Sequence, residues 1–234
     1  MILTAHQPSY LPWLGLFHKI SLADEFCIFD MVQYVKKGFD NRNLVKTAQG
    51  PKWLTVPVES SGHFSKLCSE IKIINNGWAR KHIKTIDLAY RRAPFYDLYM
   101  GQIEELLAGR KYDLLADLDR AILAFGLESF GLSPVVHRAQ DYFFTGVKSE
   151  LVLDMCMSLG ATEYIFGGEG QNYADTNTFI GAGVRPHFLD YEHPIYSQLH
   201  GDFVPNMSFI DLLFNVGPES KYLVKSAGSS RQGS

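Results

Sequence analysis

The feature that most constrains this chain is its amino-terminal stretch, where a short apolar run meets two prolines. Residues 2–5 (Ile-Leu-Thr-Ala) have the length and composition of a buried strand, and His6 and Gln7 follow directly. Pro8 and Pro12 exclude regular structure over the next few residues, because each ring fixes φ and removes a backbone donor. The chain is therefore expected to open on a buried strand that delivers two polar side chains at its carboxyl end.

Helical and strand-like segments alternate along the rest of the chain. The patterns predict helices at residues 13–21, 78–90, 95–107, 112–125, 146–160 and 173–180, with 208–216 as a further candidate. They predict strands at residues 26–29, 53–58, 70–74, 135–136, 164–166 and 185–189. Strands alternate with helices at both ends, which favours an α/β fold: a three-layer sheet with flanking helices and a helical segment in the middle of the chain.

The domain organisation is expected to be simple. No internal repeat or low-complexity linker interrupts residues 1–220, which are assigned to a single domain, with a helical lobe over 78–130 as the variant. The small, polar residues at the end of the chain predict a disordered tail over 221–234.

Composition bounds the function. Hydrophobic residues make up 46% of the chain and charged residues 20%, which is enough apolar material for a packed core. A net charge of -3 argues against a nucleic-acid partner, because such proteins usually carry a basic surface. No run approaches the roughly 20 apolar residues that span a bilayer. Three scattered cysteines and the lack of a signal peptide predict buried thiols and a cytoplasmic location.

The first candidate site is the turn after the opening strand. His6, Gln7 and Tyr10 supply an imidazole, an amide and a phenol there, and Pro8 and Pro12 hold the turn rigid. In open α/β sheets, ligands bind at the carboxyl ends of strands. The alternative interpretation is a purely structural turn in which the His6 side chain is hydrogen-bonded to the backbone.

The second candidate site follows the strand at 26–29. Donors and acceptors crowd this span: Asp30, Gln33, Asn41, Arg42, Asn43 and Lys46. Arginine offers a bidentate fork and lysine a point charge, so such a segment suits a phosphate or a carboxylate. A solvated loop with surface charges is the alternative.

Two later segments supply further candidates. Gly167-Gly168-Glu169-Gly170 follows the strand at 164–166, and glycines in that position let backbone amides approach an anion. Glu169 and Tyr173 are expected at the same sheet edge as His6 if the strands are parallel, and Lys148 is a secondary candidate at the start of its helix. A loop bent by glycine is the alternative.

An extended segment near the end of the chain contains His193 and Gln198, which could complete a polar pocket. A lone histidine is more often structural than catalytic. The eight histidines include no pair with the spacing of a helical zinc site, so no metal is predicted.

Long motifs in this chain resemble the WbqC-like protein family. The opening signature is His6-Gln7-Pro8-x-Tyr10-Leu11-Pro12-Trp13-x-Gly15-x-Phe17-x-Lys19-Ile20, and a closing one runs from Ser208 to Pro218. Between them lie Asn41-Arg42-Asn43, Trp53-Leu54-Thr55-Val56-Pro57-Val58 and Tyr191-x-His193-Pro194-x-Tyr196-x-Gln198. The resemblance covers nearly all of residues 1–218.

The resemblance implies a transferase of bacterial surface-polysaccharide (O-antigen-like) biosynthesis. It implies transfer of a glycyl or other aminoacyl group to an amino or hydroxyl group of a sugar nucleotide or glycan precursor. The catalytic residues would be His6 as general base, Gln7 and Lys46, with the other candidates binding substrate. The cofactor is left open, although a free amino acid as donor would require ATP. A homo-oligomer is also left open. The alternatives are a non-catalytic sugar-nucleotide-binding or scaffold protein, and a specialised-metabolite amide ligase.

Overall fold

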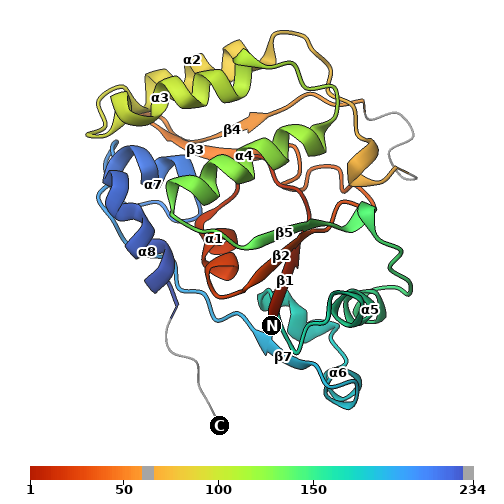
Figure 1. The fold of residues 1–234 in the computed structure, drawn as a ribbon. Coiled ribbons are helices and arrows are strands. Elements are labelled where there is room, and N and C mark those ends of the chain that lie inside the picture. The colour runs from red at the N-terminus through yellow and green to blue at the C-terminus, as the bar shows by residue number, and fades with distance from the viewer. Residues whose placement is uncertain (60–65, 229–234) are drawn as a thin grey trace.

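The computed structural model describes residues 1–59 and 66–228, which form a five-stranded parallel sheet covered by helices on both faces (Figure 1). The strands are β1 (Ile2–His6), β2 (Glu25–Ile28), β5 (Val135–Arg138), β6 (Glu163–Phe166) and β7 (Arg185–Phe188). Their order is β5-β2-β1-β6-β7, and every neighbouring pair is parallel. The α/β class predicted from the sequence is confirmed.

The remaining elements connect or cover these strands. The helices are α1 (Leu14–Ser21), α2 (Trp78–Tyr90), α3 (Tyr96–Glu104), α4 (Leu115–Ser129), α5 (Ser149–Leu159), α6 (Thr176–Gly181), α7 (Phe209–Val216) and α8 (Ser220–Ser226). Short turns of helix are η2 (Cys68–Glu70), η3 (Glu105–Gly109), η4 (Ala139–Asp141), η5 (Gly168–Asn172) and η6 (Gly217–Glu219). A separate antiparallel hairpin consists of β3 (Arg42–Thr47) and β4 (Gly50–Thr55).

The two faces of the sheet have separate cores, because successive side chains on a strand point to opposite faces. Phe26 and Ile28 of β2 pack with α1, α4 and α7, whereas Cys27 between them packs with α5. The first core also contains residues of the β3–β4 hairpin and of α2 and α3. The helical segment in the middle of the chain therefore shares its apolar core with the sheet.

Three local predictions differ from the structure. Residues 70–74 form only isolated bridges, Val58 with Ile73 and Lys72 with Leu114, in place of a strand. Residues 42–47, for which no strand was predicted, form β3. A disordered tail was expected over 221–234, but residues 221–226 belong to helix α8, which contacts α1; residues 229–234 lie outside the described residues.

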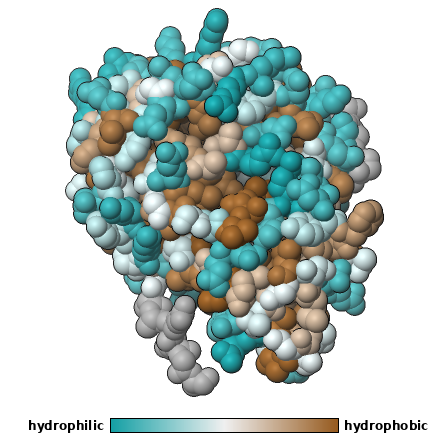
Figure 2. Space-filling model, viewed as in Figure 1, coloured by the Kyte–Doolittle hydropathy of each residue, from teal (hydrophilic) through white to brown (hydrophobic). Residues whose placement is uncertain are grey.

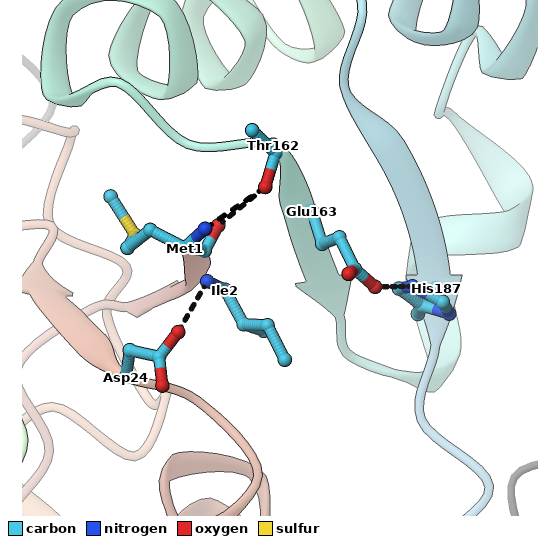
Figure 3. A network of polar contacts seen from close by, with 6 residues as sticks. All are labelled: Met1, Ile2, Asp24, Thr162, Glu163 and His187. Atoms are coloured by element: carbon cyan, nitrogen blue, oxygen red, sulfur yellow. Dashed lines mark hydrogen bonds and ion pairs between the residues drawn. The ribbon is translucent and has the colours of Figure 1, made fainter.

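The amino edge of the sheet is closed by polar contacts (Figure 3). The Met1 amino group donates to Thr162 Oγ1 at 2.9 Å, and the Ile2 amide donates to Asp24 Oδ2 at 2.8 Å. His187 on β7 lies 2.6 Å from Glu163 on β6. The first two contacts join β1 to the starts of β6 and β2, and the third joins the edge strand β7 to the start of β6.

The surface is of mixed polarity. Hydrophilic residues cover much of the face seen in Figure 2, and apolar residues gather near its middle, where Figure 1 shows β5. Val135 and Val136 on this edge strand are exposed. Among the described residues, no helix has the length and apolarity needed to cross a membrane.

Candidate functional site

A cavity of about 520 Å³ opens at the carboxyl edge of the sheet, beside β1 and β6. The strand order reverses there, since β1 is followed by β2 on one side and pairs with β6 on the other. Ligands of open α/β proteins bind at this kind of position. The wall is mostly apolar, with polar side chains from His6, Gln7, Lys19, Lys148, Glu169 and Tyr173. Five of these six were predicted from the sequence, from segments up to 167 residues apart (Lys19 is the exception).

The His6 ring is held in one tautomer. Its Nδ1 lies 2.8 Å from the carbonyl oxygen of Gln7. A carbonyl only accepts hydrogen bonds, so Nδ1 carries the proton and Nε2 keeps its lone pair. The ring also meets the edge of Trp13, with centroids 5.1 Å apart. His6 is thus an oriented neutral imidazole in the wall of the cavity.

The electrostatics of His6 favour this neutral form. Burial and, secondly, the positive charge of Lys19 lower the pKa of His6 to about 4. At neutral pH the ring is therefore unprotonated and can accept a proton. Its basicity is weak in this state, because a general base works best with a pKa near the working pH.

Lys19 is the functional candidate that sequence reasoning missed. It belongs to α1, is 4% exposed and lines the cavity. Its Nζ donates to the carbonyl of Ala5 at 2.8 Å, and burial lowers its pKa to about 8. The available signal was its place in the stretch from Leu14 to Ile20, where His18 and Lys19 are the only polar side chains and a surface helix would carry more.

Lys148 enters the cavity wall from the start of α5. Its backbone has φ 52° and ψ −117°, a combination that side-chain-bearing residues rarely adopt. Such strain persists only where the surroundings enforce it, and it concentrates at functional sites. Leu151 and Val152 also line the cavity, so the first turn of α5 faces it.

The glycine turn after β6 forms the opposite wall. Gly167 and Gly170 line the cavity, and η5 begins between them. A Cβ on Gly170 would lie 2.4 Å from the Cβ of Phe166, so only glycine fits there. Glu169 accepts a hydrogen bond from Asn172 at 2.7 Å, and Tyr173 is exposed at the rim.

The Asn41 to Lys46 segment does not reach the cavity. We expected this segment to converge with the His6 turn on one pocket. In the structure, residues 42–46 belong to β3, Asn41 directly precedes that strand, and none of them lines the cavity. Its side chains bond to backbone carbonyls: Asn41 to Val56, Asn43 to Leu11, Arg42 to Lys37 and Gly38, and Lys46 to Gly201 and Asp202. The Arg42 guanidinium also lies 4.2 Å from the Trp53 ring centroid.

The other candidates near the amino-terminal turn also lie outside the cavity. Tyr10 is buried, with its hydroxyl 2.8 Å from His82 Nδ1. Asp30 is buried, accepts from the Gln140 amide and lies 3.5 Å from Arg138. Gln33 is exposed on an isolated bridge to Leu67.

His193 and Gln198 belong to a second polar cluster, centred on the buried Asp211 of α7. Gln198 and the hydroxyls of Tyr90 and Tyr196 all donate to its carboxylate, at 2.8, 2.9 and 2.8 Å. His193 stacks on Tyr196, with centroids 6.3 Å apart. The cluster ties the 191–204 segment to α2 and α7, which is a framework role.

No group of three or more metal-ligating side chains (His, Cys, Asp or Glu) able to hold an ion occurs in the part of the chain that the structure describes.

Comparison with known proteins identifies the family. The model of the WbqC-like protein family matches residues 7–222, which include the closing signature, the opening signature from Gln7 onward, and every polar residue of the cavity except His6. The chain belongs to the WbqC-like protein family. The resemblance inferred from the sequence motifs is therefore confirmed.

A curated relative of this WbqC-like chain matches it over nearly the whole length of both proteins. It is the Mycobacterium tuberculosis protein named "Uncharacterized protein Rv1507c", 34% identical over 215 residues that span 92% of this chain and 93% of the relative. No solved structure matches the chain.

Proposed function

We propose that this WbqC-like protein is a cytoplasmic transferase of bacterial surface-polysaccharide biosynthesis. It carries a glycyl or other aminoacyl group to an amino or hydroxyl group of a sugar nucleotide or glycan precursor. The β1–β6 cavity is its active site. A cytoplasmic location suits Cys27, Cys68 and Cys156, which are free and buried.

The observation that carries the proposal is the tautomer of His6 in the cavity wall. With Nδ1 on the Gln7 carbonyl, Nε2 takes the proton of the acceptor N–H or O–H as that atom attacks the acyl carbonyl. The new bond joins the acceptor to the acyl carbon, and the bond to the leaving group breaks. A free amino acid has a poor electrophile in its carboxylate. Its transfer would use ATP, forming an acyl adenylate with release of pyrophosphate and then releasing AMP on transfer.

The size and lining of the cavity support a substrate of this class. Sites for small molecules and cofactors usually measure about 300–1,000 Å³ and combine apolar walls with a few placed polar groups. At about 520 Å³ the cavity falls in this range. Its lysines, Lys19 and Lys148, suit the anionic parts of a nucleotide or amino acid, and Glu169 suits a cationic amine.

The test is product formation by the purified chain. Glycine, ATP and a panel of amino-sugar and neutral sugar nucleotides are incubated with the protein, and the acceptors are analysed by mass spectrometry. We expect one acceptor to gain the mass of a glycyl residue. His6→Asn should abolish this product while leaving the thermal midpoint near that of the wild type.

The matched control is His187→Asn on the edge strand β7, because this ring pairs with Glu163 and does not line the cavity. It should keep the activity. Calorimetric binding of a sugar nucleotide without any product in the wild type would instead indicate a binding or scaffold protein, and full activity of His6→Asn would remove His6 from the mechanism.

A further inference from the structure

Lys19 is a buried cation without a carboxylate partner. Its side chain is 4% exposed, and no carboxylate of residues 1–59 or 66–228 lies within ion-pair distance of it. Lysine is almost never fully buried unless it is paired, because the ammonium loses its hydration. The position therefore needs an explanation from its surroundings.

A structural role accounts for only part of the position. One ammonium proton is donated to the Ala5 carbonyl, at 2.8 Å, which links α1 to β1. A single neutral acceptor does not offset the loss of hydration of a full charge. The contrast is Lys46, which is 2% exposed and donates to two carbonyls, those of Gly201 and Asp202, away from the cavity. Lys19 has one such acceptor and faces a cavity large enough for a ligand.

The groups around Lys19 indicate which kind of anion would bind its ammonium. A second lysine, Lys148, lines the same cavity at the first turn of α5, and the glycines of the β6 turn line it from another side. Two ammonium groups, a helix start and a glycine turn together suit a multiply charged group with several acceptor oxygens. A phosphoryl group has this chemistry.

We propose that the Lys19 ammonium binds a phosphoryl group of the ligand inside the β1–β6 cavity. The inference rests on the proposed function only in taking this cavity as the ligand site. Phosphoryl binding at Lys19 would also change the basicity of His6. The charge of Lys19 is one of the two causes that keep the His6 ring a weak base, and a phosphoryl group beside Lys19 would remove that cause. Ligand binding would then raise the basicity of His6.

The test is calorimetric binding of pyrophosphate and ATP to the wild type and to Lys19→Met, a variant that fills similar space without charge. Lys84→Met is the control, because it removes the same charge from the exposed surface of α2. We expect Lys19→Met to bind pyrophosphate about ten- to a hundredfold more weakly, in line with the loss of a charge-assisted hydrogen bond. Lys84→Met should bind as the wild type does. Acetate at equal ionic strength should show no dependence on Lys19.

Three results would overturn the proposal. The wild type and Lys19→Met could bind pyrophosphate and ATP with equal affinity, the wild type could bind neither ligand, or only acetate binding could depend on Lys19. If Lys19→Met does not fold, NMR titration of the wild type decides. Bound pyrophosphate should raise the pKa of Lys19 from about 8 and that of His6 from about 4, and unmoved values overturn the proposal. Lys19-dependent binding without glycyl transfer contradicts the proposed function alone, whereas transfer with Lys19-independent binding contradicts this inference alone.

Discussion

The side-chain amide of Asn43 donates a 2.7 Å hydrogen bond to the carbonyl oxygen of Leu11, 32 residues earlier in the chain. Leu11 has a positive φ of 44°, which is uncommon for a residue with a side chain. Asn43 is 1% exposed, and its own Oδ1 accepts from the Leu44 amide. The β3–β4 hairpin thus stabilises the strained turn that follows His6, although no residue of the hairpin lines the cavity.

Asn43→Ala should destabilise the protein by about 1–3 kcal/mol, because it leaves the buried Leu11 carbonyl without its donor. Urea denaturation of the purified variant measures this. Asn177→Ala, at an exposed position of α6, is the control and should stay within about 0.5 kcal/mol of the wild type. An Asn43 variant as stable as its control would show that the turn holds its shape without this bond.

The pH dependence of activity tests the role of His6. A base acts when it is neutral, so activity should be present above the pKa of His6 and lost as the pH falls through about 4. The acidic limb of the pH profile of kcat/KM reports the free enzyme and should lie near the His6 pKa of about 4. The limb in kcat reports the complex and should lie at higher pH if a bound anion offsets Lys19. An acidic limb of kcat/KM near the ordinary histidine pKa, about 6.5, would contradict the environment that the structure gives His6.

Much of the architecture follows from local sequence patterns. The run at residues 2–5, the two prolines and the next apolar stretch predict β1, α1 and β2, and the 3.6-residue period predicts α2 with its observed bounds, Trp78–Tyr90. Parallel pairing then brings the ends of β1 and β6 to one edge, so that His6, Glu169 and Tyr173 line one cavity. Fold topology made this part of the site predictable.

The rest depends on contacts between distant parts of the chain. The sequence led us to expect Lys46 in the site as a catalytic residue, yet it is buried on β3 against carbonyls 155 and 156 residues away. Lys19 becomes a site candidate only because α1 packs against the sheet edge where the cavity opens. A local pattern carries no information about which buried lysine faces carbonyls and which faces a cavity.

Asp40 should make the protein less stable as the pH rises. Burial raises the pKa of this 4% exposed carboxyl from 3.8 to about 6. The folded state therefore holds a proton that the unfolded state releases, so this contribution is fully present below about pH 4 and lost as the pH rises through 6. The difference in pKa corresponds to roughly 3 kcal/mol.

Asp40→Asn removes this titration while keeping an acceptor for the Val35 amide, which lies 3.4 Å from Asp40 Oδ2. The variant should match the wild type near pH 4 and exceed it by about 2–3 kcal/mol near pH 7. Denaturant unfolding across this range measures the difference between the two proteins, which cancels the opposing titration of the buried histidines. A constant difference at all pH values would show that Asp40 ionises freely in the folded protein.

Gly126→Ala and Gly101→Ala should have opposite effects, although both place alanine inside a helix. Alanine is favoured over glycine in helices by about 1 kcal/mol, and nothing lies within 4 Å of a Cβ at the exposed Gly101 of α3. Gly101→Ala should therefore stabilise the protein by about 0.5–1 kcal/mol. At Gly126 of α4, the new Cβ would lie 2.3 Å from Cζ of Phe17, a ring that is fully buried against Phe130 and Phe209. Overpacking of this kind costs about 1–3 kcal/mol or more, which outweighs the helix preference.

Combining Gly126→Ala with Phe17→Leu should cost less than the sum of the two single changes, because the shorter side chain makes room for the methyl group. Additive losses in this double-mutant cycle, measured by urea unfolding, would show that Phe17 is not what excludes a side chain at position 126.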